Sequence, residues 1–453
     1  MDSKIGPLLK HALSRISAVP AEQKPLIMNA LAAHYDIRGN GTHMPFFIKF
    51  TNLSPAAGEA WEDFRKRALA RLRQRAVDIG HPGATPLFLS HSLASALPPH
   101  EIAAFAQHAD VERVELDPTV MAATMDVAFS DLGMPDYLKA SGGLTGHGVR
   151  VAVLDSGVDT EQPFLQVEDS VSTADEPVEI PGQHGTHCAG SIASRDDTFR
   201  GIAPGVPLLN IKVLKANGTG TSTSVVRGLE QALEMKADVA SLSLGFNHLP
   251  VGTDGGHGWT CTAENKCVMC TAVDNATALG LVVCVAAGND HLRADTLRKY
   301  GQADSFDTEL GCPGQAAGAI TVGAVSKQTF EPAYFSSNGP TSYGASKPDL
   351  SCDGVSITST VPVPRNPDGT VKANPSRNDL FFRLSGTSMA TPMVAAACAL
   401  IIQSRRSQGL SAKPEEVRSD LLARCVTKLA YDANVVGAGR LNMAAGLDTA
   451  PVT

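Results

Sequence analysis

The 453-residue sequence predicts an α/β protein with a doubly wound, mostly parallel sheet flanked by helices, preceded by a small ferredoxin-like α/β domain. Two observations predict this class. From about residue 148, short apolar runs bounded by turn residues alternate with helical patterns, which is typical of βαβ units. Before residue 120, strand and helix patterns follow one another as β-α-β-α-β, which favours a small sandwich of the ferredoxin kind.

The smaller domain is expected over residues 44–120. Its expected elements are a strand at MPFFIKF, a helix over 56–78, a strand at PLFLSHSLASALP, a helix at HEIAAFAQHA and a strand at VERVELDPTV. Two short helical patterns in residues 1–43 predict an N-terminal helical extension. Residues 121–146 are expected to link the smaller domain to a larger one at 147–453.

The larger domain is predicted from apolar runs that turn residues separate. These runs are VRVAVLD, PLLNIKVLK, ADVASLSLG, LVVCVAAGN and AGAITVGAV. Helical patterns such as VVRGLEQALEMK and AVDNATALG lie between them. Sheets of this kind place their ligands outside the carboxyl ends of the strands, so chemically active residues are expected there.

Composition and charge exclude several kinds of partner. The formal net charge is −8, without the basic footprint of a nucleic-acid-binding protein. Polar and charged residues interrupt the N-terminal segment, so no secretion signal is predicted, and we find no apolar stretch long enough to cross a bilayer. We therefore expect no nucleic-acid partner, no membrane and a cytoplasmic location.

Two candidate residues carry a carboxylate and an imidazole. Asp155 ends the run VRVAVLD, at the expected site edge, although an aspartate after a strand is often only a helix cap. His184, in HGTHCAG, lies at the turn into a helical pattern. Together with His187, three residues later, it also suits a metal site or a core position.

Two further candidates carry a hydroxyl and an amide. Ser388, in SGTSMATP, precedes a strongly apolar helix, where unpaired N–H groups favour developing negative charge; an ordinary N-cap serine gives the same pattern. Asn289 follows the run LVVCVAAGN, where it either donates to an oxyanion or merely completes a turn. Amide hydrolysis by serine needs a hydroxyl, a base, an orienting carboxylate and oxyanion donors, and the four residues supply candidates for each.

The sequence resembles the subtilisin-like (S8) serine peptidases. The resemblance rests on LDSGVD, HGTHCAG, SLSLG, AAGND and GTSMATP, in the family's order of Asp, His, Asn and Ser, and runs from about residue 146 to about residue 447. It implies that Asp155 orients the imidazole and that His184 is the general base and acid. It also implies that Ser388 is the nucleophile, with Asn289 and the backbone N–H of Ser388 forming the oxyanion hole.

The resemblance also implies how a substrate binds. Two backbone edges would clamp an extended protein or peptide chain by strand addition. These edges are Gly218, Thr219 and Gly220 on one side and Ser243, Leu244 and Gly245 on the other. Residues 44–120 resemble the family's inhibitory propeptide, whose tail, at about 117–130, would thread the active site and be cleaved there.

The sequence departs from the family after Ser243-Leu244-Gly245, where NHLPVGTDGGHGWTCTAENKCVMC is a longer insertion. Cys261, Cys267 and Cys270, with His257 nearby, could hold a zinc ion, but their spacing matches no standard zinc motif, so a local disulfide or free thiols are favoured. The nine cysteines cannot all pair within one chain and several lie in apolar runs, which favours a reduced compartment. The resemblance implies no cofactor for the chemistry, and structural calcium is common among relatives.

Three other functions compete with a self-maturing endopeptidase. A partner-activated regulatory protease would stay inactive until another molecule displaced residues 1–120. A non-catalytic binding scaffold on the same fold would need a broken catalytic set, whereas all four positions are filled. A metallohydrolase built on His184 and His187 would leave GTSMATP unexplained.

Overall fold

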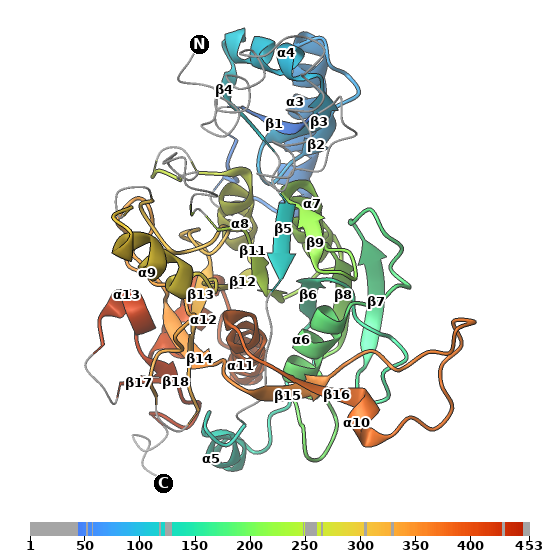
Figure 1. Ribbon diagram of the computed structural model, residues 1–453, viewed down its shortest axis with the longest axis vertical. Coiled ribbons are helices and arrows are strands. Elements are labelled where there is room, and N and C mark those ends of the chain that lie inside the picture. Colours follow the sequence, from blue (N-terminus) through green and yellow to red (C-terminus); the bar gives the residue numbers. More distant parts are fainter. Residues whose placement is uncertain are drawn as a thin grey trace.

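A computed structural model describes residues 44–50, 53–56, 58–116, 119–122, 129–247, 249, 261–263, 266–302, 306–327, 330–427 and 431–446. The expected helical extension at 1–43 and His257 lie outside the described residues. In Figure 1 the larger domain carries a smaller domain on one side, and a short strand, β5 (Thr119–Ala122), extends from the smaller domain into the larger one.

A nine-stranded sheet with the order β17-β18-β14-β13-β12-β10-β6-β8-β7 forms the centre of the larger domain. The strands are β6 (Val151–Asp155), β7 (Val167–Ser172), β8 (Leu208–Lys212), β10 (Val239–Leu242), β12 (Val282–Ala286), β13 (Ile320–Val325), β14 (Leu350–Asp353), β17 (Cys425–Val426) and β18 (Arg440–Leu441). Neighbours from β7 to β18 pair in parallel, and only β17 runs antiparallel at the edge. The predicted doubly wound α/β class is confirmed.

Helices cover both faces of this sheet because successive strand residues point to opposite faces. Along β6, Val151 and Val153 pack into one apolar cluster with α6 (Gln183–Ala193) and α11 (Thr387–Ser407). Ala152 and Leu154 pack into the other cluster, with α7 (Ser222–Glu234) and α8 (Val268–Ala278). The remaining elements of the larger domain are α5 (Met134–Ala140), β9 (Thr219–Thr221), α7 (Ser222–Glu234), β11 (Leu244–Gly245), α8 (Val268–Ala278), α9 (His291–Lys299), β15 (Ile357–Thr360), α10 (Arg377–Leu380), β16 (Phe381–Leu384), α12 (Pro414–Leu422) and α13 (Ala433–Val436).

Helix α11 is long and strongly apolar. Among the described residues, it is the one helix whose length and composition would allow it to span a membrane. The expectation from the sequence, that no apolar stretch is long enough to cross a bilayer, therefore missed this helix. However, 89% of this apolar stretch is buried inside the protein. The helix packs against β10, β12, β13 and α6, which is the environment of a core helix.

The smaller domain is a four-stranded antiparallel sheet with the order β2-β3-β1-β4. Its elements are β1 (Met44–Phe50), α3 (Trp61–Asp78), β2 (Thr85–Leu87), β3 (Ser92–Leu97), α4 (Pro99–Ile102), a 3₁₀ turn, η3 (Ala103–Gln107), and β4 (Val111–Leu116). The single strand expected at PLFLSHSLASALP is therefore a hairpin, and the second helix is short and ends as a 3₁₀ turn. The resulting β-α-β-β-α-β order is that of the ferredoxin-like fold.

The two domains share one apolar cluster, in which side chains of β1, α3 and β2 join those of α7 and α8. Polar contacts surround Leu89 of the smaller domain: its N–H donates to Glu230 Oε1 at 3.3 Å, and its carbonyl accepts from the Asn275 amide. Arg65 and Glu234 form an ion pair of 2.7 Å at the rim. Burial at this interface raises the pKa of Glu230 to about 8, even though the Leu89 and Phe88 N–H groups lower it.

This burial makes the stability of the chain depend on pH. The folded-state pKa of Glu230, about 8, lies above the ordinary value of 4.5, so the stability linked to its protonation is fully present below pH 4.5 and is lost as the pH rises through 8. We predict that Glu230→Gln, in a Ser388→Ala chain, is as stable as its parent near pH 5. Near pH 8.5 it should be more stable than its parent by a few kcal/mol.

Chemical denaturation of the two chains across this pH range measures the effect. The Glu234 carboxylate, on the same helix but at the rim, adds to the raised pKa of Glu230, so the comparison variant Glu234→Gln should reduce the pH dependence only slightly. A constant stability difference between Glu230→Gln and its parent at every pH would contradict the assigned burial of the Glu230 carboxyl group.

Candidate active site

Asp155 and His184 meet at the carboxyl edge of the central sheet. Asp155 is the last residue of β6, and His184 lies in the first turn of α6; both side chains are buried. The two carboxylate oxygens of Asp155 lie 2.8 and 2.9 Å from His184 Nδ1. A carboxylate can only accept, so Nδ1 carries the proton, and in the neutral ring the basic nitrogen is Nε2.

The electrostatics of this pair favour a charged imidazole. Burial lowers the pKa of His184, but the Asp155 carboxylate and the Cys188 sulfur outweigh it and hold that pKa well above its ordinary value. Asp155 is itself held by the N–H of Ser156, which donates to Oδ1 at 2.6 Å. The pair can therefore accept a proton on the ring and stabilise the cation that results.

Ser388 is the second residue of α11, where the first N–H groups of a helix have no partner within it. Its hydroxyl donates to the carbonyl oxygen of Ser243 at 3.0 Å. Ser243 directly follows β10, so the end of a neighbouring strand reaches the hydroxyl. Cys188 connects both parts of the site, because its thiol lies 3.9 Å from His184 Nδ1 and donates to the Ser388 carbonyl at 3.6 Å.

Asn289 is fixed in orientation by Thr387, a neighbour that the sequence analysis did not single out although it lies within GTSMATP. The Thr387 N–H lies 2.9 Å and the Thr387 hydroxyl 3.1 Å from Asn289 Oδ1. A backbone N–H only donates, so the amide atom that faces it is the oxygen. The amide nitrogen, the donor end of Asn289, is therefore turned away from Thr387.

The two predicted backbone edges enclose a strand of the protein's own chain. Strand β5 (Thr119–Ala122) lies between β9 and β11 and is antiparallel to both, as Figure 1 shows. Ala122 is opposite Leu244, and Met121 is opposite both Gly245 and Thr219.

Glycine is required at two of these edge positions. A Cβ on Gly220, which lies opposite Val120, would come within 2.6 Å of the Val213 carbonyl oxygen. A Cβ on Gly245 would come within 2.9 Å of the Cys312 carbonyl oxygen. Gly218 lies one residue before β9, in a turn with φ of 82°, so it shapes the edge without pairing.

His187, the alternative metal partner of His184, is turned elsewhere. Its Nε2 lies 3.1 Å from the Phe382 carbonyl oxygen, and burial lowers its pKa to about 3. Among the described residues, two groups of three or more potential metal ligands lie close together. One is Asp155, His184 and Cys188; the other is a cluster of four cysteines away from this site.

Comparison with known proteins identifies the family. Residues 146–439 match the Subtilase family, and this segment contains Asp155, His184, Asn289, Ser388 and both backbone edges that flank β5. The chain is a subtilase. It is therefore a serine endopeptidase and a hydrolase, and subtilases need no cofactor for their chemistry.

Named relatives of this subtilase support the assignment. It is 32% identical to "Serine protease AprX" of Bacillus subtilis over 404 residues, covering 85% of this chain and 82% of that protein. It is 36% identical to subtilisin E of Bacillus subtilis over 267 residues, covering 58% and 57% of the two chains, and 36% identical to a Bacillus pumilus subtilisin. The match to AprX covers 85% of this chain, which is more than residues 146–453 alone contain. The similarity to AprX therefore extends into the N-terminal part of the chain.

The contacts of His184 predict the effect of Asp155→Asn. Removing the carboxylate should lower the pKa of His184, because the neutral amide no longer stabilises the imidazolium and burial continues to oppose it. Proton NMR titration of the imidazole resonances in a Ser388→Ala chain measures the shift. The resonance of His91, in the smaller domain, is the internal control and should not move, and an unchanged His184 titration would contradict the assigned pairing.

Proposed function

We propose that this subtilase cleaves peptide bonds with Asp155, His184 and Ser388 as its catalytic triad and is made as a zymogen that its own N-terminal domain inhibits. The observation that carries the proposal is the position of β5, an extended strand that enters between two backbone edges and leads toward Ser243, the residue that accepts the Ser388 hydroxyl.

In the proposed mechanism, the Ser388 hydroxyl leaves Ser243 and attacks the substrate carbonyl carbon. His184 Nε2 takes the proton from Ser388 and later donates it to the leaving amine, while Asp155 holds the ring and stabilises its charge. The negative oxygen of the tetrahedral intermediate accepts from Asn289 Nδ2 and the backbone N–H of Ser388, at the positive end of α11. Water then hydrolyses the acyl-enzyme by the same sequence of proton transfers.

Substrate binding is proposed to use the contacts that β5 makes. Backbone pairing with β9 and β11 is independent of side chains, so the enzyme would accept many extended protein or peptide segments and select among them through side pockets. The smaller domain, which packs on α7 and α8, would hold β5 in the cleft and thereby exclude substrates. The chain would thus inhibit itself with a product-like strand.

The register of β5 indicates where the chain is cut. The pairing is antiparallel, and Ala122 lies opposite Leu244. Strand β5 therefore ends at Ala122, one residue short of the level of Ser243, whose carbonyl accepts the Ser388 hydroxyl. We therefore expect cleavage next to Ala123, within a residue on either side, inside the range 117–130 that the sequence predicts.

Self-cleavage gives the first test of this proposal. Purified full-length chain should lose a fragment of about the first 123 residues over time, because the nucleophile and the strand belong to one molecule. Intact-mass spectrometry measures the fragment, and the same chain with Ser388→Ala should stay whole.

Two results would overturn parts of the proposal. Equal cleavage of both chains would show that Ser388 does not cut the bond. If both chains stay whole but the wild type reacts with a fluorophosphonate, the triad stands and activation requires a partner, as in a regulatory protease.

The donor role of Asn289 is separable from its contact with Thr387. Asn289→Asp keeps an oxygen acceptor for Thr387 but removes the amide donor, whereas Asn289→Ala removes both. We predict that both variants lower kcat by about 10²–10³-fold with little change in KM, since an oxyanion donor acts in the transition state. Steady-state kinetics on the matured enzyme measures this. Recovery of kcat in Asn289→Asp would show that Asn289 acts only by anchoring Thr387.

A further inference from the structure

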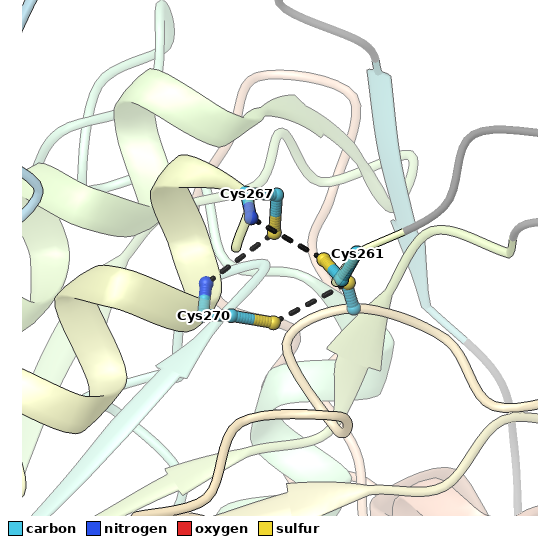
Figure 2. A group of neighbouring side chains, drawn as sticks. Cys261, Cys267 and Cys270 are labelled. Atoms are coloured by element: carbon cyan, nitrogen blue, oxygen red, sulfur yellow. Dashed lines mark hydrogen bonds between the residues drawn. The ribbon is translucent and has the colours of Figure 1, made fainter. Parts of the chain in front are cut away.

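Four buried cysteines converge near β11, one of the two backbone edges that flank β5. Cys261, Cys267 and Cys270 lie within the insertion, the last two at the start of α8, and Cys312 comes from the segment that precedes β13. Their four sulfur atoms all lie within 4.8 Å of one another. Figure 2 shows the sulfurs of the three labelled residues, Cys261, Cys267 and Cys270, turned toward one another.

The sulfur separations suit one tetrahedral metal ion. The Sγ atoms of Cys261 and Cys312 are 3.4 Å apart, and those of Cys270 and Cys312 are 3.3 Å apart. A zinc ion with Zn–S bonds of about 2.3 Å holds its four sulfurs about 3.8 Å from one another, within the range seen here. A disulfide bond of about 2.05 Å is much shorter than either separation, and it would bring Cys312 Sγ close to one partner, whereas here that sulfur lies almost equally close to two.

Polar N–H groups point at three of the sulfurs. The backbone N–H of Cys267 donates to Cys261 Sγ at 3.3 Å, and that of Cys270 donates to Cys267 Sγ at 3.4 Å. The Gln315 side-chain amide donates to Cys312 Sγ at 3.8 Å. Thiols are weak acceptors, whereas metal-bound thiolates carry charge that such donors stabilise. The start of α8 adds the positive end of a helix dipole.

We propose that Cys261, Cys267, Cys270 and Cys312 bind one structural zinc ion. Binding would release the thiol protons and give a closed, four-coordinate site with no open position for water, which suits a structural role and not a catalytic one. This assignment replaces the disulfide or free thiols that the spacing of the first three cysteines favours. Cys312 supplies the missing fourth ligand, from 42 residues beyond Cys270.

The zinc ion would hold the edge on which β5 rests. Cys312 and Phe246 exchange two backbone hydrogen bonds, of 2.9 and 3.0 Å, and Phe246 directly follows β11. The metal would therefore connect three segments: the end of the insertion, the start of α8 and the backbone that supports β11. Such a metal site would stabilise a substrate-binding edge that a long insertion follows in the chain.

Metal analysis of the full chain tests the proposal without relying on peptidase activity. A Ser388→Ala chain, purified without chelators, should contain one zinc ion per chain by inductively coupled plasma mass spectrometry. Cys312→Ser and Cys267→Ser should each lose most of it, while Cys425→Ser, which alters a cysteine outside the cluster, should retain it. Circular dichroism shows whether the variants are folded.

A cobalt replacement keeps the test decisive if the cysteine variants fail to fold. The parent chain, stripped of metal under reducing conditions and given Co²⁺, should show the intense visible bands and sulfur charge-transfer absorption of tetrahedral thiolate coordination. A parent chain that contains no metal and gives no such spectrum would overturn the proposal. So would disulfides among these cysteines, or stoichiometric iron in place of zinc.

Discussion

The hydrogen bonds between Asp155 and His184 form because a parallel sheet brings the carboxyl ends of its strands to one edge. Strand β6 ends at Asp155, and α6 begins on the same edge, so the carboxylate and the imidazole meet as the chain starts its crossover. The strands β10 and β12 lead to Ser243 and Asn289 at that edge, and α11 starts beside them. If these elements did not meet at one edge, Asp155 would be a buried carboxylate without a partner, which would destabilise the fold.

The relation between the two domains follows from unpaired strand edges. Strands β9 and β11 each present backbone groups that need a partner, and β5 supplies one to both. The smaller domain holds β5 there through a shared apolar cluster and through Leu89, which contacts both α7 and α8. Proposed inhibition and proposed substrate binding thus use the same backbone geometry, and glycine at positions 220 and 245 keeps that geometry open.

The sequence predicts the doubly wound sheet well, because apolar runs and helical patterns are local signals. Motifs likewise locate Asp155, His184, Asn289 and Ser388, since each occupies a strand end or a helix start. Contacts between distant segments leave no local signal. The hairpin within PLFLSHSLASALP depends on pairing with β1, and the raised pKa of Glu230 depends on burial by another domain. The position of Cys312 beside Cys270 depends on the fold as a whole, so cysteine spacing alone points away from a metal.

The central claim is that Ser388 is a nucleophile activated by its neighbours, and active-site labelling tests it most directly. The matured enzyme is treated with a fluorophosphonate, digested and mapped by mass spectrometry. The account predicts one modified residue, Ser388, with labelling slowed strongly by His184→Ala in a chain freed of its N-terminal domain by another protease. A folded, matured enzyme that is not labelled, or is labelled at a different serine, would contradict the account.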